Sequence, residues 1–540
     1  MQRRGLRPYV AALAGLGLLA AACGGDDGGG GAGDNAETAN TIDQSIRNAL
    51  EETATTAEGT ATTEAGPEIT EPASMEEWEE LWASERAAVV ERIKENGWGL
   101  QADGKTITGP EGFTIDLAAC AAGWSNTEGI TDTEFKIGQS IAQSGTLADY
   151  GNYAKAIDAL VGYYGDQGAF KDSEGKTRKP VYLQKDDGYD PARAIPNVDE
   201  LLDSEKVFAI WTLGTPATMK VYGKINERCV PNILSMTGHP AFGDPVNHPW
   251  TSGAPVPSYT TETQLWGNFI EERVDEFPDK IVVAALVMNN DFGKVYDAGF
   301  RDFIAQSAVL KDKVEFVTET IEPAAPTITD PMTTLASKNP NFFIAMTAGT
   351  SCTQAVTEAA QNGMKESVEY LFQPLTCTGV SFVSKEKVGG DGMASDGWWI
   401  FNPGIKDIKD ESLREDVWIS FIRDLVTKDG LDPDSSSSLS GGFSYAWPFV
   451  QTLLIAQELD GGLTRANVIV AHRSLDMTPP THDWGIRTFM NGNKDAFLNE
   501  GGNFAKFDSA KQQWVPEGQL YDLNGKSSNC AWDQSVSACK

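Results

Sequence analysis

Residues 280–306 read KIVVAALVMNNDFGKVYDAGFRDFIAQ. The run from Ile281 to Met288 is apolar without a break, and it ends at the polar turn Asn-Asn-Asp-Phe-Gly. After this turn, apolar residues recur at helical spacing as far as Gln306. A short apolar strand followed at once by an amphipathic helix is typical of a strand buried in a parallel sheet. The stretch therefore predicts a strand at 280–288 and a helix at 293–306 within an α/β fold.

The same alternation extends in both directions. It predicts further strands at 314–318, 342–346 and 368–372 and helices at 262–276, 331–337 and 352–362. An upstream series predicts strands at 135–141, 181–185, 207–211 and 232–236 and helices at 150–164, 191–203 and 216–228. A Pro-containing linker, 253–257, separates the two series. Strands spaced by helices of this length predict parallel sheets with right-handed crossovers, and two such series predict two Rossmann-like lobes.

The last third of the chain is predicted to be mostly helical. Past Asn402-Pro403-Gly404 we expect helices at 413–427, 442–459 and 465–471, followed by a hairpin at 502–514. Helices without strands of their own must pack on an existing sheet, so we expect the chain to return to the first lobe. The expected first lobe comprises 132–257 and 404–480, and the expected second lobe comprises 258–403 and 481–540.

The N-terminus has the pattern of an export signal. Three arginines precede an apolar stretch that is shorter than a typical membrane-spanning helix, and Leu19-Ala20-Ala21-Ala22-Cys23 resembles a bacterial lipobox. We expect a signal peptide at 1–22 and a lipid on Cys23, although an ordinary cleavage site that happens to precede a cysteine is the alternative. Residues 23–74 are rich in Gly, Ala, Thr and acids, which predicts a disordered acidic tether with at most a transient helical turn near 42–50. Residues 75–131 predict an extension with an amphipathic helix at 76–95 and a β-hairpin, packed on the main body.

Composition narrows the function classes. The 540 residues carry 43 Lys and Arg against 77 Asp and Glu, a formal net charge of −34, which argues against binding nucleic acid. There are four histidines, and they are not spaced as metal ligands. We find no Gly-x-Ser-x-Gly, no His-Glu-x-x-His and no phosphate-binding loop, so we expect no enzyme, no cofactor and no metal.

Short motifs give a family resemblance. Phe135-Lys136-Ile137-Gly138, Ser144-Gly145 and Tyr150-Gly151 resemble the opening of branched-chain amino-acid (Leu/Ile/Val) binding proteins, and 289–293 resembles their second-lobe turn. These are type I periplasmic solute-binding proteins of ABC importers. The order of elements from about 132 to 525 follows this family. The resemblance implies two α/β lobes joined by three crossovers that close on a small ligand.

Residues that follow the strands are the candidate ligand contacts. In parallel sheets, ligands bind beyond the carboxyl ends of the strands. First-lobe turns there offer close backbone approach and hydroxyl donors, although helix capping explains Ser and Thr at such positions equally well. The resemblance favours ligand contact for Gly214-Thr215 and Thr237, and it places Tyr150 and Phe292 in the cleft. The full set of expected contacts is Ser144, Gly145, Tyr150, Gly214, Thr215, Thr237, His239 and Phe292.

One departure from the family bears on the ligand. Its amino-acid binders carry a carboxylate after the strand at 368–372 to pair with the ligand's ammonium, whereas this chain reads Gln373-Pro374-Leu375-Thr376-Cys377. An unpaired ammonium in a closed cleft is unfavourable. Asp291 could substitute, and a turn residue or helix cap is its other interpretation. We therefore expect a small polar ligand, which can be an amino acid, an amide or a short carboxylate.

The cysteines predict three disulfides. Without Cys23, six remain, an even number in an oxidising compartment. Cys352 and Cys377 follow neighbouring strands at one sheet edge, Cys530 and Cys539 are close in sequence, and Cys120 then pairs with Cys229. Exchange between Cys120 and a tail cysteine is the alternative.

These observations predict a monomeric, lipid-anchored receptor on the extracytoplasmic face of the membrane. It is expected to capture its ligand by hinge closure and to deliver it to an ABC permease powered by nucleotide-binding subunits. A ligand-binding sensor on the same fold is the alternative function, and a surface protein that binds no small molecule is the least favoured.

Overall fold

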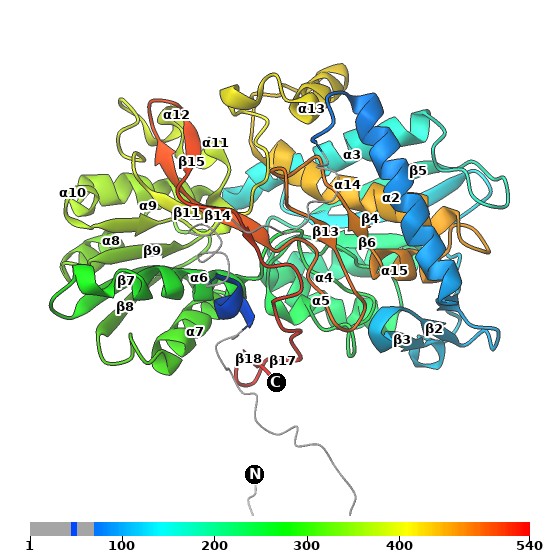
Figure 1. The fold of residues 1–540 in the computed structure, drawn as a ribbon, viewed down its shortest axis with the longest axis horizontal. Helices are drawn as coiled ribbons and strands as arrows, with labels where there is room; N and C mark the ends of the chain where they lie inside the picture. The colour runs from blue at the N-terminus through cyan, green and yellow to red at the C-terminus, as the bar shows by residue number, and fades with distance from the viewer. Residues whose placement is uncertain (1–44, 51–69) are drawn as a thin grey trace, which may run out of the picture. The chain divides into compact units, whose positions relative to one another are not determined.

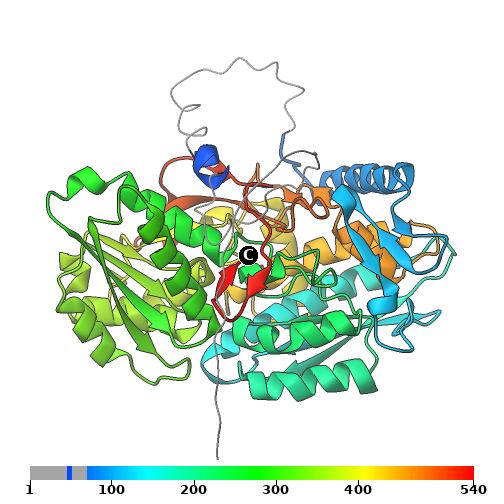
Figure 2. The same cartoon turned by 90° about the horizontal axis from the view of Figure 1, so that it is seen from below.

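A computed structural model describes residues 45–50 and 70–540. The expected signal peptide, Cys23 and most of the tether lie outside these residues. The expectation of disorder throughout 23–74 does not hold at 45–50, which is helical. Ile46 and Ala49 are buried there, and Arg47 pairs with Glu271 at 2.7 Å. This short helix lies beside the helices of the second lobe (Figures 1 and 2).

The first lobe is built on a parallel sheet of order β5-β4-β6. Its strands are β4 (Glu134–Ile141), β5 (Lys179–Asp186) and β6 (Ala209–Thr212). Its helices are α3 (Gly151–Asp166), α4 (Pro191–Asp199), α5 (Thr215–Glu227), α13 (Val417–Lys428), α14 (Ser438–Gln457) and α15 (Arg465–His472). The late helices return to this lobe, because α14 packs along α3 (Figure 1).

The strand expected at 232–236 is not formed. Only isolated bridges occur there, between Leu213 and Met236 and between Asn232 and Thr251. Leu234 has a φ of 64°, which interrupts an extended strand. The segment instead shares its backbone hydrogen bonds between β6 and residues 250–252.

The second lobe is built on a mixed sheet of order β15-β14-β11-β10-β9-β7-β8, in which β16 also pairs with β14. The parallel strands are β7 (Ile281–Met288), β8 (Val314–Ile321), β9 (Phe342–Met346), β10 (Tyr370–Phe372) and β11 (Trp399–Asn402). The antiparallel ones are β14 (Gly501–Asp508), β15 (Gln513–Pro516) and β16 (Tyr521–Asp522). The predicted hairpin thus extends a parallel sheet at its edge.

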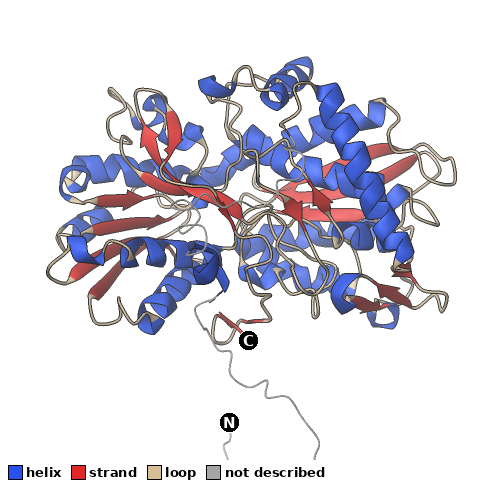
Figure 3. Ribbon diagram, viewed as in Figure 1, coloured by secondary structure: helices blue, strands red, loops and turns tan. Residues whose placement is uncertain are grey.

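Helices cover the faces of both sheets (Figure 3). Those of the second lobe are α6 (Tyr259–Glu271), α7 (Asp291–Gln306), α8 (Thr329–Ala336), α9 (Thr350–Gln361), α10 (Met364–Ser367), α11 (Val380–Val383) and α12 (Lys385–Val388). Within 45–50 and 70–540, no helix has both the length and the hydrophobicity to cross a bilayer.

The N-terminal extension packs on the first lobe, and a three-stranded sheet takes the place of the expected hairpin. It comprises α2 (Met75–Glu95) and a three-stranded antiparallel sheet of β1 (Gly99–Leu100), β2 (Thr106–Thr108) and β3 (Thr114–Asp116). Trp82 of α2 is fully buried, and its ring centroid lies 5.4 Å from that of Trp447 on α14. Two small ribbons complete the chain, β12 (Asp476–Met477) with β13 (Thr488–Phe489) and β17 (Trp532–Asp533) with β18 (Ala538–Cys539).

Three disulfides are formed, and they are the pairs that the sequence predicts. They join Cys120 to Cys229, Cys352 to Cys377, and Cys530 to Cys539. The second of them fastens the N-terminal turn of α9 to the turn that follows β10, at the carboxyl edge of the second sheet.

Candidate functional site: a cavity at the carboxyl ends of two sheets

A cavity of about 300 Å³ lies where strands of both sheets end. Its lining includes residues that follow β4, β5, β6, β7, β9, β10 and β11. The crossover segments at 254–259 and 402–413 and the first half of α14 complete the wall. The volume is in the range of small-molecule sites. Convergence of so many strand ends on one cavity is the arrangement by which open α/β folds bind ligands.

The first-lobe wall presents hydroxyls at the start of α5. Gly214 precedes this helix with a φ of 86°, and a Cβ atom there would lie 2.3 Å from the ring of Tyr189. Glycine is therefore required both for the turn and for the close approach. The Oγ1 atoms of Thr215 and Thr237 lie 2.7 Å apart, and both side chains hydrogen-bond Tyr259. These residues form a compact cluster of hydroxyl groups on the cavity wall.

Tyr150 connects the two lobes across the cavity. Its hydroxyl donates to the carbonyl oxygen of Thr376 at 3.2 Å and accepts from the N–H of Gly349 at 3.3 Å. Both partners follow strands of the second sheet, whereas Tyr150 precedes α3 of the first lobe. Its ring also packs on Phe382 with centroids 6.1 Å apart. A change in the position of either lobe must therefore change the contacts of Tyr150.

Aromatic rings make up much of the remaining wall. They come from Tyr150, Tyr153, Tyr189, Tyr259, Phe292, Phe382, Tyr445 and Trp514. Burial raises the pKa of each of the five tyrosines, so their hydroxyls are neutral at physiological pH. The cavity therefore offers apolar faces and neutral hydroxyls over most of its surface.

The charged part of the wall is the loop at 405–413, after β11. Lys406 pairs with Asp416 and with Glu71, each at 2.7 Å. Burial disfavours its charge, yet these hydrogen bonds outweigh that effect and raise its pKa. Asp407 and Asp410 lie in the same wall, and so does Asp483, whose pKa burial raises to about 6.

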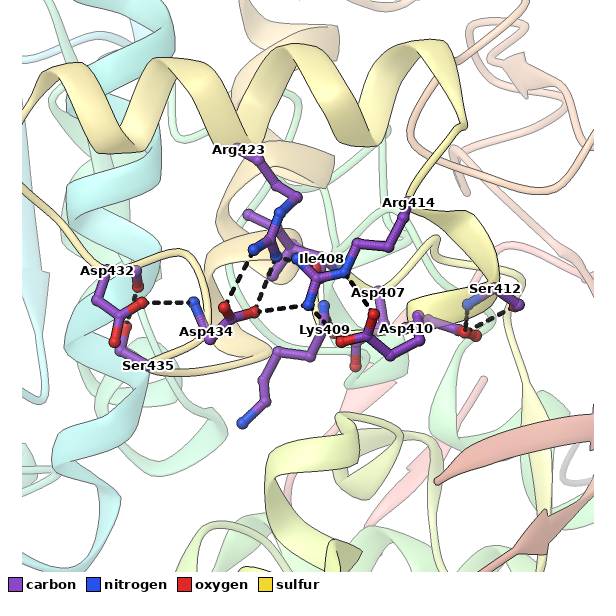
Figure 4. Close-up of polar contacts among 12 residues, drawn as sticks. Asp407, Ile408, Lys409, Asp410, Ser412, Arg414, Arg423, Asp432, Asp434 and Ser435 are labelled. Carbon is purple, nitrogen blue, oxygen red and sulfur yellow. Dashed lines mark hydrogen bonds and ion pairs between the residues drawn. The ribbon is translucent and has the colours of Figure 1, made fainter. Parts of the chain in front are cut away.

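An ion-pair network on the side of this loop away from the cavity holds the loop in place (Figure 4). Arg423 of α13 donates to Asp434 at 2.9 and 3.1 Å and to the carbonyl oxygen of Ile408 at 2.8 Å. Arg414 donates to the same Asp434 and to Glu411. The loop is thereby held in place by side chains outside the cavity.

Glu262 lies beneath the second-lobe wall. This fully buried residue of α6 accepts from the N–H of Leu375 at 2.8 Å and from the hydroxyl of Tyr296. Leu375 lines the cavity, and Tyr296 stacks on Tyr259, which also lines it. Burial raises the pKa of Glu262 to about 8, so the residue is largely protonated at neutral pH.

Five of the eight expected contacts line the cavity: Tyr150, Gly214, Thr215, Thr237 and Phe292. The other three do not. Ser144 points its hydroxyl at Asp186, and Gly145 belongs to the same loop. His239 is buried against Trp532 and caps the turn at 240–242, and burial lowers its pKa to about 3. Asp291 is also outside the lining.

Sequence reasoning missed Tyr189, the loop at 405–413 and the residues of α14. Tyr189 follows β5, so the strand-end rule that selected Thr215 also applies to it. The other two reach the cavity only because the chain returns to it from later crossovers. The sequence predicts that the chain returns to the first lobe, but no local pattern at 405–413 or 437–445 indicates that these residues reach the cavity.

The profile of the periplasmic binding proteins matches residues 134–488. No curated protein sequence matches the chain. Among solved structures, a branched chain amino acid ABC transporter protein from Thermus thermophilus with bound valine is 15% identical, with a TM-score of 0.61. That match covers 73% of this chain and 98% of the other. A fatty acid ABC transporter substrate-binding protein from Thermomonospora curvata is 18% identical, with a TM-score of 0.58 and coverages of 78% and 97%. A solute binding protein of an ABC transporter from Rhodopseudomonas palustris in complex with 3,4-dihydroxy benzoic acid is 17% identical, with a TM-score of 0.58 and coverages of 73% and 98%.

Proposed function

Because the chain belongs to the periplasmic binding protein family, we propose that it is the extracytoplasmic solute receptor of an ABC importer. It captures a small polar ligand in the cavity and delivers it to a membrane permease. The observation that carries this proposal is a single cavity whose wall is drawn from both lobes and from the crossovers between them. A ligand that contacts both lobes stabilises the arrangement in which they meet, which is the physical basis of hinge closure.

The lobes in this mechanism comprise 132–257 with 404–480 and 258–403 with 481–540. The ligand contacts are Tyr150, Gly214, Thr215, Thr237 and Phe292. Related folds bind chemically different molecules, since the solved structures above hold valine in one case and 3,4-dihydroxy benzoic acid in another. An amino acid, an amide and a short carboxylate are therefore all tested as ligands.

Thermal denaturation against a panel of amino acids, their amides and their deaminated acids tests the proposal. A ligand at one hundred times its dissociation constant adds about 2.7 kcal/mol to the free energy of unfolding, which raises the melting temperature measurably.

With the ligand found, we expect Thr215→Ala and Tyr150→Ala to weaken its binding about tenfold or more. Thr333→Ala, on the exposed face of α8, is the control. Unchanged affinity in both cavity variants would contradict the assignment of the site.

We also propose that the mature protein is anchored through a lipid on Cys23. The lipobox-like sequence before this residue supports the anchor. Cys23→Ser is expected to shift the protein from the membrane fraction to the soluble fraction when it is produced in a bacterium. Fractionation followed by mass spectrometry of the N-terminal peptide checks this. Wild-type protein that carries no lipid would overturn the proposal.

A further inference from the structure

Asp407 is a carboxylate in the cavity wall to which the described residues supply no cation. Its Oδ2 accepts from the N–H of Val380 at 3.0 Å and its Oδ1 accepts from the N–H of Lys409 at 2.9 Å, while the Ser437 side chain gives a further hydrogen bond. The nearby carboxylate of Asp410 raises the pKa of Asp407. Burial is the main cause of its raised pKa. The three hydrogen bonds favour the ionised carboxylate, whereas burial and Asp410 oppose it. No cation of the described residues pairs with Asp407, so a cation bound in the cavity would stabilise its ionised form.

The cationic side chains near Asp407 either pair with other carboxylates or point away from it. Lys406 pairs with Asp416 and Glu71. Arg414 and Arg423 both pair with Asp434, on the far side of the loop (Figure 4). The Lys409 side chain points away from Asp407, although its backbone N–H bonds it (Figure 4). Together with Asp410 and Asp483, this end of the cavity has an excess of negative charge, which favours a positively charged ligand group.

Asp407 and several aromatic side chains line the same cavity. Val380 bonds Asp407, and Phe382, two residues further on, packs on Tyr150. The Tyr150 ring lies 5.5 Å from that of Tyr153, which lies 5.8 Å from that of Tyr445. Tyr445 belongs to α14, which begins beside the Ser437 that bonds Asp407. Aromatic rings and a carboxylate that line one cavity are suited to an organic cation, because cation–π attraction and ion pairing add together.

We propose that the ligand is an organic ammonium compound, a primary amine or a quaternary ammonium, whose cation pairs with Asp407 and whose apolar body contacts the tyrosines. This inference rests on the proposed function, since it names the ligand class of the same cavity. The carboxylate is absent from the segment after β10, where the family resemblance places it. In this chain the loop at 405–413 supplies a carboxylate instead. It is that of Asp407, which accepts from the N–H of Val380 at the start of α11.

Matched ligand pairs test the charge directly. Choline is compared with its neutral isostere 3,3-dimethylbutan-1-ol, and 2-phenylethylamine is compared with 3-phenylpropanamide and 3-phenylpropionate, by thermal denaturation and titration calorimetry. We expect a cation to raise the melting temperature and its neutral or anionic counterpart to have no effect. Equal binding of the isosteres, or binding of 3-phenylpropionate in preference to the amine, overturns the inference and leaves the proposed receptor function intact. If neither these compounds nor the amino-acid panel changes the melting temperature, the result counts against both the ligand class and the proposed receptor function.

Asp407→Asn tests the residue. Asparagine keeps an oxygen for one backbone N–H and removes the charge, but its amide group faces the other backbone N–H. The ligand-free variant is therefore expected to melt at a lower temperature than the wild type, and its affinity is measured well below that temperature. Its affinity for the cation is expected to fall at least about thirtyfold. Asp432→Asn is the control, because it removes the same charge from an exposed position nearby that does not line the cavity. Cation binding that survives in Asp407→Asn overturns the assignment, as does an equal loss in Asp432→Asn.

Discussion

Replacement of Trp82 by alanine is expected to lower the free energy of unfolding by about 3–5 kcal/mol, the usual effect of removing a large buried aromatic side chain. Trp82 is fully buried between the extension and the first lobe. Its ring lies 5.5 Å from Trp78, 6.4 Å from Trp418 and 5.4 Å from Trp447, between centroids, and its indole N–H donates to the carbonyl oxygen of Thr478 at 3.0 Å. The variant loses this contact area and leaves a cavity. Urea denaturation followed by far-ultraviolet circular dichroism measures the change.

The result also tests whether the extension is an integral part of the first lobe. If it is, the extension and the first lobe unfold in one transition in both proteins, and the midpoint of that transition shifts to a lower urea concentration in the variant. Glu91→Ala, at an exposed position of the same helix, is expected to change the free energy by less than about 0.5 kcal/mol. A variant that loses less than about 1 kcal/mol, or in which α2 melts separately, would show that the extension is only loosely attached.

The alternation of strands and helices was readable from the sequence because each buried parallel strand is an apolar run and each helix has a periodic apolar face. The run at 281–288 and the helix after it are found almost as predicted. The order of the strands was not readable, since β14 joins β11 only after about a hundred intervening residues. The strand expected at 232–236 fails because Leu234 adopts a positive φ, which no local pattern announces.

The residues of the candidate site likewise fall into those that the sequence predicts and those that only the fold reveals. Thr215 and Phe292 follow strands directly, and a rule about strand ends finds them. Ser144 obeys the same rule, yet Asp186 takes its hydroxyl, a competition that only the fold reveals. Asp407 and Tyr445 reach the cavity through the return of the chain, so their contribution depends on tertiary contacts between distant segments. The sequence correctly shows that no acid follows β10, but it does not show that the loop at 405–413 brings Asp407 into contact with Val380, a few residues further on.

The pH dependence of stability is expected to carry a large contribution from Glu262. Its pKa is about 8 in the folded protein, against an ordinary value of 4.5. Between these two values the unfolded chain releases this proton and the folded chain retains it. The stabilisation is therefore fully present below about pH 4.5 and is lost as the pH rises through 8. From pH 5 to pH 8 we expect the wild type to lose about 3.5 kcal/mol relative to Glu262→Gln, with a slope that approaches about 1.4 kcal/mol per pH unit between the two pKa values.

Comparison of the two proteins isolates this one group, because every other titrating residue is common to both. Glutamine resembles the protonated acid, since its oxygen can accept from the N–H of Leu375 and its amide can bond Tyr296. Glu272→Gln, at the exposed end of α6, controls for the loss of a charge and should follow the wild type. Parallel curves for the wild type and Glu262→Gln would show that Glu262 is ionised throughout. The carboxyl group accepts both of its hydrogen bonds, from the N–H of Leu375 and the hydroxyl of Tyr296, so ionisation leaves these contacts in place and the loss of stability comes from the buried charge itself.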